Sequence, residues 1–207
     1  MPYLPLPPRG ADDYGRVIGE DFASVLTRAL DGDVAAFARL WRDLNPSVLR
    51  YLALGGEPAD DIASDTWATV VKGLRRFRGD EAAWRAWVFT TARRRAIDAG
   101  RRRARAAGRE EAWRQWQVET VGLDPAEVAA EHMDTAAALR LLRSLSPLQA
   151  EVVLLRVVAG LPVEEVARVV GRSPGAVRVA AHRGLHRLER LLTHEGVTPV
   201  EAAALRE

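Results

Sequence analysis

The sequence of 207 residues has no cysteine, a single lysine (Lys72) and no long apolar run. Without cysteine, disulfides, thiolate zinc sites and a cysteine nucleophile are excluded. No stretch approaches the roughly 20 apolar residues that a membrane-spanning helix needs. Residues 1–9 also lack the basic segment and the apolar segment of a secretory signal. These absences predict a cytoplasmic protein that does not enter a membrane.

Helix-forming residues dominate what is present. Ala, Leu, Arg and Glu are abundant and β-branched runs are scarce, which favours helix over sheet. The net charge is only +2, but residues 75–105 carry eleven arginines against three acids, whereas residues 106–137 carry seven acids against two arginines. We therefore predict an all-α protein whose opposite charges occupy different segments.

Apolar residues recur with helical spacing in two separate parts of the chain. Four prolines among the first eight residues prevent a regular helix there. Gly122 and Pro125 interrupt the acidic segment. The predicted organisation is a flexible arm at 1–20, a helical domain at 21–105, an acidic linker at 106–137, a second helical domain at 138–193 and a tail at 194–207.

Residues 161–191 have the pattern of a helix-turn-helix motif. Gly171 is expected to end the first helix in a left-handed conformation, and Ser173 to cap the second. Helical spacing places one face of the second helix toward the core: Val177, Ala181, Leu185, Leu188 and Leu192. The other face then carries Arg178, Val179, His182, Arg183 and His186. Such a face can read base edges in a major groove, and the alternative is a helical hairpin with solvated arginines.

The arginine-rich segment 75–105 contains aromatic residues among its charges: Phe77, Trp84, Trp87 and Phe89. Basic surfaces with aromatic rings suit single-stranded nucleic acid, because unstacked bases need a flat apolar partner. However, the three-and-four spacing of Trp84, Trp87 and Val88 favours a place in the core for Trp87. Clustered positive charge still indicates a polyanionic partner, because such charges repel one another.

Residues 60–67 form an acidic, amphipathic segment beside the basic one. Asp60 or Asp61 is expected to cap its helix, and the apolar face is expected to hold Ile62, Trp67, Val70, Val71 and Leu74. In the preceding helical segment, Trp41 falls on the apolar face with Phe37 and Leu40.

No catalytic residues, cofactor site or metal site are predicted, so we do not expect an enzyme. His182 and His186 have a spacing that can bind a metal, but no suitable carboxylate accompanies them.

The order of several short motifs resembles the extracytoplasmic-function (ECF) group of sigma factors, which belong to the sigma-70 family of RNA polymerase subunits. The resemblance covers about 30–105 and 138–192. It rests on Asp31-Gly32-Asp33, Ala59-Asp60-Asp61-Ile62, Asp65-Thr66-Trp67, Phe77-Arg78-Gly79, Leu145-Ser146-Pro147, Gly160-Leu161-Pro162-Val163-Glu164-Glu165 and Gly175-Ala176-Val177-Arg178. Each motif alone is modest, but their order and spacing together are specific.

The resemblance implies a fold and a set of site residues. The fold would be a sigma-2-like helical bundle and a sigma-4-like helix-turn-helix joined by a linker. The acidic helix would bind the polymerase β′ clamp helices through Asp60, Asp61, Asp65 and Thr66. The minus-ten promoter element would be bound by Phe77, Arg78, Gly79, Asp80, Arg94, Asp98, Arg101 and Arg102. The minus-thirty-five element would be bound by Ser173, Gly175, Arg178, Val179, His182 and Arg183.

The resemblance also implies partners. They are the polymerase core, contacted at the β′ clamp helices and the β flap, promoter DNA, and an anti-sigma factor; the chain itself would be a monomer. Relatives commonly have Asn where this chain has Arg94, and Thr or Ser where Ala176 and Val179 stand. A promoter sequence can therefore not be transferred from a relative. The alternatives are a dimeric helix-turn-helix regulator with a helical sensor domain and a helical adaptor that binds only protein.

Overall fold

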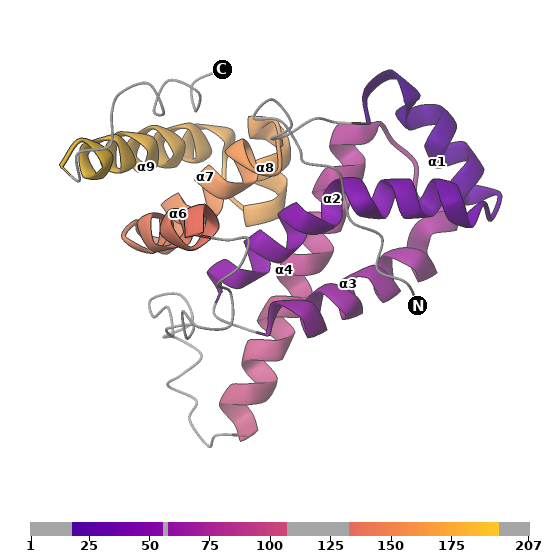
Figure 1. Ribbon diagram of the computed structural model, residues 1–207, viewed down its shortest axis with the longest axis horizontal. Coiled ribbons are helices and arrows are strands. Elements are labelled where there is room, and N and C mark those ends of the chain that lie inside the picture. The colour runs from indigo at the N-terminus through magenta and orange to yellow at the C-terminus, as the bar shows by residue number, and fades with distance from the viewer. Residues whose placement is uncertain (1–17, 56–57, 107–132, 195–207) are drawn as a thin grey trace.

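The structure, a computed structural model, describes residues 18–55, 58–106 and 133–194. These residues form helices and connecting turns without any strand, which confirms the predicted all-α class. The elements are η2 (Gly19–Asp21), α1 (Phe22–Leu30), α2 (Val34–Leu54), α3 (Ala59–Gly73), η3 (Leu74–Arg76), α4 (Glu81–Ala106), α6 (Met133–Arg143), α7 (Pro147–Val157), α8 (Val163–Val170) and α9 (Pro174–His194). In Figure 1, α1 to α4 form one group and α6 to α9 a second group beside it.

Capping fixes the start of the long helix in the first group. The Asp33 carboxylate accepts hydrogen bonds from the backbone N–H groups of Ala35 and Ala36, at 2.8 and 3.0 Å. The Ala36 N–H and the Arg28 guanidinium hold the pKa of Asp33 below its ordinary value. The predicted break at residues 31–33 is therefore the boundary between α1 and α2.

The predicted cap of α3 is wrong. The helix begins at Ala59 with Pro58 at the N-cap, and no side chain caps it. The backbone φ of Pro58 is −56°, close to the helical value, so the helix starts directly after the proline. Asp60 and Asp61 instead lie in the first turn, where negative charge interacts favourably with the helix dipole.

The core of the first group is formed by the inward faces of its four helices. Leu40, Leu44, Val48, Val70 and Val88 are fully buried in it. Two residues predicted to share this face lie outside: Val71 is 51% exposed and Trp41 is 37% exposed. Each residue of a helix is turned about 100° from the last, so Val70 and Val71 cannot both face one narrow core.

The second group follows its predicted boundaries closely at the helix-turn-helix. Gly171 ends α8 with φ 67° and ψ 42°, the left-handed conformation expected of it. The Ser173 hydroxyl accepts a hydrogen bond from the Ala176 backbone N–H at 3.2 Å, which confirms the predicted cap of α9. Gln149 accepts a hydrogen bond from the Ser146 backbone N–H at 3.3 Å, in a capping box with Pro147 at the first helical position.

The outer limits of both groups differ from the prediction. Residues 18–20, assigned to the arm, already belong to the first group, because the Ile18 N–H donates to Glu81 Oε1 at 2.8 Å. Helix α6 begins at Met133, inside the segment predicted as linker. Most of the predicted arm and linker (1–17 and 107–132) and the tail from residue 195 lie outside the described residues.

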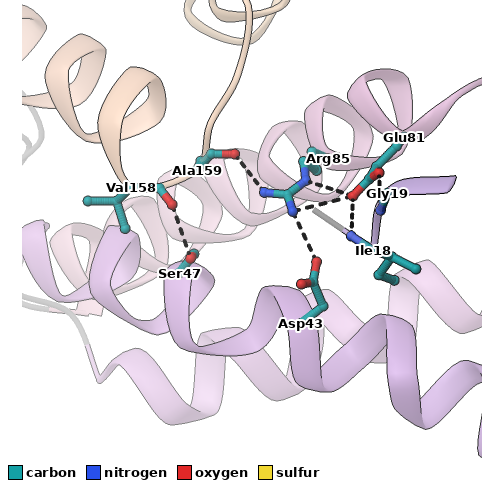
Figure 2. A network of polar contacts seen from close by, with 8 residues as sticks. All are labelled: Ile18, Gly19, Asp43, Ser47, Glu81, Arg85, Val158 and Ala159. Atoms are coloured by element: carbon teal, nitrogen blue, oxygen red, sulfur yellow. Dashed lines mark hydrogen bonds and ion pairs between the residues drawn. The ribbon is translucent and has the colours of Figure 1, made fainter. Parts of the chain in front are cut away.

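The two groups pack against each other. Helix α4 lies against α8, and α2 contacts α6 and α7, so that one continuous cluster of buried apolar residues runs through both groups. Figure 2 shows the polar part of this boundary. Arg85 of α4 contacts Asp43 of α2 at 3.1 Å and donates to the backbone carbonyl of Ala159, which follows α7, at 3.0 Å.

Arg85 therefore does not belong to the basic surface predicted for residues 75–105. It is only 4% exposed, and Glu81 Oε1 lies 3.4 Å from the same guanidinium. Two carboxylates and a carbonyl replace the water that the charge loses on burial. The surface charge of the segment is correspondingly smaller than the sequence suggests.

A close approach between α9 and α7 gives the first testable prediction. A Cβ added at Gly184 would lie 2.8 Å from Val153 Cγ2, whereas a Cβ at Gly175 in the same helix would meet nothing within 4 Å. We expect Gly184→Ala to lower the free energy of unfolding by about 1–3 kcal/mol relative to Gly175→Ala, because the added methyl overpacks a tight contact. Urea denaturation of both variants measures the difference, and equal stabilities would contradict the packing.

Candidate functional site

The predicted recognition face of α9 is on the surface. Arg178, Val179, His182 and Arg183 are all exposed, and Val179 is exposed to 50% although it is apolar. On the opposite side Val177, Ala180, Gly184 and Leu188 are buried. The helix thus separates a packing face from a basic face, as a helix that enters a DNA groove must.

Arg178 has a partner in the free protein. Its Nη2 lies 3.1 Å from Glu164 Oε1 of α8, and both side chains are about 60% exposed. An ion pair this exposed contributes little, typically about 0–1 kcal/mol. The pair therefore holds the guanidinium near the start of α9 while leaving it available to a stronger acceptor.

An open pocket at the start of α9 contains two arginines that the sequence analysis did not single out. It is lined by Arg168 and Arg172 and by one carboxylate, Glu164, together with Gly171, Ser173 and other small residues. Backbone N–H groups at the start of a helix attract anions, and guanidinium groups add to this attraction. Arg168 also contacts Glu165 one turn earlier in α8. Positive side chains beside a helix N-terminus were the signal that could have identified them.

The second basic surface follows the outside of α4 and the turn before it. Eight of its eleven arginines are exposed: Arg75, Arg76, Arg78, Arg94, Arg101, Arg102, Arg103 and Arg105. Asp98 lies among them, 4.0 Å from Arg101. Arg93 and Arg95 are half-buried; Arg95 donates to Thr69 Oγ1 of α3 at 2.7 Å. The eight exposed arginines therefore still give this surface a strong positive charge.

The turn at 77–80 is built differently from its prediction. Phe77 is 9% exposed, and its ring stacks on Trp87 with centroids 5.3 Å apart. Trp84 packs edge-on against Phe77 at 5.5 Å. Phe77 is thus part of the core and cannot stack on a base as placed, which corrects its assignment to a DNA-contacting surface. Trp87 is half-buried and packs against the core, so the core role favoured for it holds in part.

The other three residues of this turn have structural tasks as well. Gly79 has φ 153°, and a Cβ there would lie 2.8 Å from Ala83 Cβ, so glycine is required. Asp80 Oδ1 accepts a hydrogen bond from the Ala83 N–H at 2.8 Å and thereby caps α4. Arg78 is exposed and donates to the carbonyl of Arg75 at 2.9 Å. Gly79 and Asp80 remain exposed too, so the turn still presents a surface.

The turn and the far part of α4 do not form a single pocket. Arg94 follows Asp80 by fourteen residues along the chain, which corresponds to about 20 Å along a helix. Asp98, Arg101 and Arg102 lie further still. The predicted residues therefore provide two contact areas along one extended face.

The acidic face of α3 is only partly as predicted. Asp60, Asp61 and Asp65 are exposed. Thr66, predicted beside them, is fully buried, and its hydroxyl donates to the Ile62 carbonyl at 2.7 Å. Thr66 therefore cannot contact a partner, and three carboxylates remain as the surface.

In the described part of the chain, no group of three or more His, Asp or Glu side chains is arranged to hold a metal ion. His182 and His186 lie edge to face, with ring centroids 6.3 Å apart. Within the same residues, no helix combines the length and the apolar character required to cross a bilayer.

Comparison with known families matches both groups. Residues 37–106 match the model for Sigma-70 region 2, and residues 135–188 match the model for Sigma-70, region 4. The chain is 33% identical over 184 residues to the ECF RNA polymerase sigma factor SigD of Mycobacterium tuberculosis, covering 83% of this chain and 84% of that protein. It is 35% identical over 190 residues to the ECF RNA polymerase sigma factor ShbA of Streptomyces griseus, covering 87% and 97%.

Solved structures share the fold. CnrH, in complex with the cytosolic domain of CnrY, superposes with a TM-score of 0.59 at 22% identity, over 84% of this chain and 99% of that one. The sigma factor RpoE of Bartonella quintana, in complex with the anti-sigma factor NepR, superposes with a TM-score of 0.55 at 24% identity, over 75% and 97%. At these identities the likeness concerns the architecture alone.

Phe77 and Arg78 give a test of the corrected turn. We expect Phe77→Ala to lower the free energy of unfolding by about 3–5 kcal/mol, because it empties an aromatic cluster. Arg78→Ala should change it by about 1 kcal/mol at most, since an exposed hydrogen bond is lost. Chemical denaturation followed by circular dichroism compares the two. An unchanged free energy of unfolding in Phe77→Ala would contradict the core position of Phe77.

Proposed function

The chain belongs to the ECF group of sigma factors in the sigma-70 family, and we propose that each of its three charged surfaces binds a different part of the polymerase or the promoter. As a sigma factor it directs RNA polymerase to promoters and aids their opening. The observation that carries the proposal is the separation of one acidic surface on α3 from two arginine-bearing surfaces on α4 and α9. The relatives are sigma factors, so a dimeric helix-turn-helix regulator is not favoured.

The acidic surface, Asp60, Asp61 and Asp65, docks the protein on the polymerase core at the β′ clamp helices. Exposed carboxylates steer association with a basic partner and set its register. Their place in the first half of α3 is held by the buried face, where Trp67 Nε1 donates to Asn45 Oδ1 of α2 at 2.8 Å. The carboxylates are thus presented from a rigid helix.

The arginine surface along α4 receives the minus-ten element. Arg78, Gly79 and Asp80 contact it at the turn, while Arg94, Asp98, Arg101 and Arg102 contact it further along the helix. Phosphates of an opened strand supply the negative charge that this surface needs. Relatives commonly carry asparagine at the position of Arg94, so this chain either prefers another base there or captures the base through different atoms.

The exposed face of α9 reads the minus-thirty-five element in the major groove. Arg178 and Arg183 can form paired hydrogen bonds with guanine, and Val179 can contact a thymine methyl. Ser173, Gly175 and the open pocket with Arg172 lie at the start of the helix, where a backbone phosphate fits. His182 completes the reading face.

The remaining assignments concern partners. The second group docks on the polymerase β flap, and the protein acts as a cytoplasmic monomer that performs no chemistry itself. The polymerase core provides the metal and the active site. CnrH and RpoE were solved with CnrY and the anti-sigma factor NepR, which supports an anti-sigma partner for this chain too.

Charge reversal on α3 tests the docking surface. Asp61→Arg combined with Asp65→Arg should abolish association with core polymerase, because two attractive contacts become repulsive. Co-elution of the full-length protein with core in size-exclusion chromatography measures this.

The matched control is Asp21→Arg with Asp31→Arg, a reversal of two exposed carboxylates outside α3. It should leave assembly intact. Normal association of the α3 variant with core polymerase, or an equal loss of association in both variants, would contradict the docking role of the acidic surface.

Arg178 tests the reading face. Arg178→Ala should cost about 1–3 kcal/mol of promoter binding by holoenzyme and relax preference at one upstream base. Arg140→Ala, which removes an exposed arginine from α6, should change neither. Binding of holoenzyme to a promoter library separates affinity from preference. If Arg178→Ala leaves promoter selection unchanged, α9 is not the recognition helix.

A further inference from the structure

Two neighbouring glutamates in the first turn of α8 are each paired with a different arginine. Glu165 is only 7% exposed and contacts Arg168 of its own helix. Glu164 lies on the surface, and its Oε1 accepts a hydrogen bond from Arg178 Nη2 of α9 at 3.1 Å. Glu165 therefore belongs to the packed part of α8, whereas Glu164 shares a surface with the exposed face of α9.

The pair of Glu164 and Arg178 crosses the turn of the helix-turn-helix motif. The two residues are fourteen positions apart in the sequence. Gly171, with φ 67°, ends α8 between them, and α8 packs against α9. The backbone therefore holds the Glu164 carboxylate in a constant position relative to the start of Arg178. An arginine side chain has many rotamers, and a fixed acceptor at its end selects among them.

The hydrogen bond leaves the Arg178 guanidinium able to bind a base. Arginine has five N–H donors in one plane, and the contact with Glu164 is made through Nη2. A guanine needs two N–H groups, one for its O6 atom and one for its N7 atom. The donors that Glu164 does not use can provide them. A carboxylate and a guanine can thus bind one guanidinium at the same time.

Glu164 is also the only acidic residue that lines the open pocket at the start of α9, beside Arg168 and Arg172. A carboxylate next to a DNA backbone repels the phosphates, which lowers the affinity for every sequence. An arginine that is held by this carboxylate is less free to turn toward the nearest phosphate. Both effects act against binding that is independent of sequence.

We propose that Glu164 is a positioning residue that sharpens the specificity of the reading face, because it directs Arg178 toward a guanine edge and opposes contact of Arg178 with phosphate. The inference rests on the proposed function, in which α9 lies in the major groove. The preferred partner is duplex DNA with a guanine opposite Arg178. On a site without that guanine, the arginine loses its base contact and gains no phosphate in exchange.

The exposure of the pair limits the size of this effect. Both side chains are about 60% exposed, and such a pair changes an equilibrium constant by up to about fivefold. A bidentate contact between arginine and guanine discriminates between bases by about 5- to 150-fold. Arg178 therefore provides the discrimination, and Glu164 modulates it.

The test is binding of reconstituted holoenzyme to promoters in which the minus-thirty-five element is randomised. The readout is the guanine preference, defined as the affinity with guanine divided by the mean affinity with the other bases at one position. Arg178→Ala identifies that position. We expect Glu164→Ala to lower the guanine preference there by about three- to fivefold, because the guanidinium is no longer directed.

Affinity for sites that lack the guanine should change in the opposite direction. We expect Glu164→Ala to bind them about two- to threefold more tightly at low salt, since a repulsive charge is removed. The salt dependence should become steeper by about one phosphate contact, because Arg178 turns to the backbone. A purely structural role of Glu164 would instead weaken binding to all sequences together and leave the guanine preference unchanged.

Glu164→Gln covers the case that Glu164→Ala lacks native helical content. Glutamine keeps the length of the side chain and an oxygen that can accept from Arg178, but it has no charge. We expect a loss of guanine preference of about twofold, together with the tighter binding to sites that lack guanine. Circular dichroism checks the helical content of both variants.

Asp21→Asn is the matched control. Asp21 contacts Arg39 at 2.9 Å, and the two side chains are 64% and 51% exposed, so the variant removes one carboxylate from a comparable pair in the first group. It should change neither the guanine preference nor the affinity for sites without guanine. The double variant Glu164→Ala with Arg178→Ala should have the same preference as Arg178→Ala alone, because Glu164 acts through Arg178.

The outcomes separate this inference from the proposed function. An unchanged guanine preference in both Glu164 variants, or a further loss of preference when Glu164→Ala is added to Arg178→Ala, overturns the inference alone. If Arg178→Ala itself changes no base preference, the proposed reading face is wrong and the inference fails with it.

Discussion

Packing of one helical face leaves the opposite face free to carry charge, and the surfaces of this protein depend on that constraint. Helix α3 buries Ile62, Thr66 and Val70 and presents Asp61 and Asp65 outward. Helix α9 does the same with arginine and histidine in place of aspartate. The acidic surface of α3 and the arginine-bearing surfaces of α4 and α9 thereby lie on separate helices, where each can meet a different macromolecule.

The same constraint explains why some charges are not available. Arg85 and Arg93 belong to the arginine-rich segment, but both face the second group. Arg93 pairs with Glu151 of α7, whereas Arg85 donates to the Ala159 carbonyl and forms its ion pairs within the first group. A buried charge needs partners in fixed positions, so it holds a particular arrangement of helices. The exposed arginines of α4 keep much of their hydration, and we propose that they contact a nucleic acid. The position of an arginine around α4 therefore determines whether it stabilises the fold or is available to a ligand.

Local features of the site could be predicted from sequence. Gly171 and Ser173 follow from turn chemistry, and the structure confirms both. Helical spacing predicts the exposed face of α9, but of its predicted core face only Val177 and Leu188 are buried, whereas Ala181, Leu185 and Leu192 are half-buried. Thr66 was misplaced although its spacing of four from Ile62 and from Val70 marked it as buried. Phe77 and Arg85 gave no local signal, because their surroundings come from Trp87 and from a backbone carbonyl at Ala159. Helical spacing and turn chemistry do not predict contacts between segments that are distant in the sequence.

The central claim is that this chain selects where transcription begins. Run-off transcription with core polymerase, purified protein and a library of DNA fragments tests it most directly, with start sites mapped from the products. The account predicts discrete starts that require the protein and share two upstream elements. Transcripts that begin at the same positions with core alone, or no transcripts at all, would contradict it.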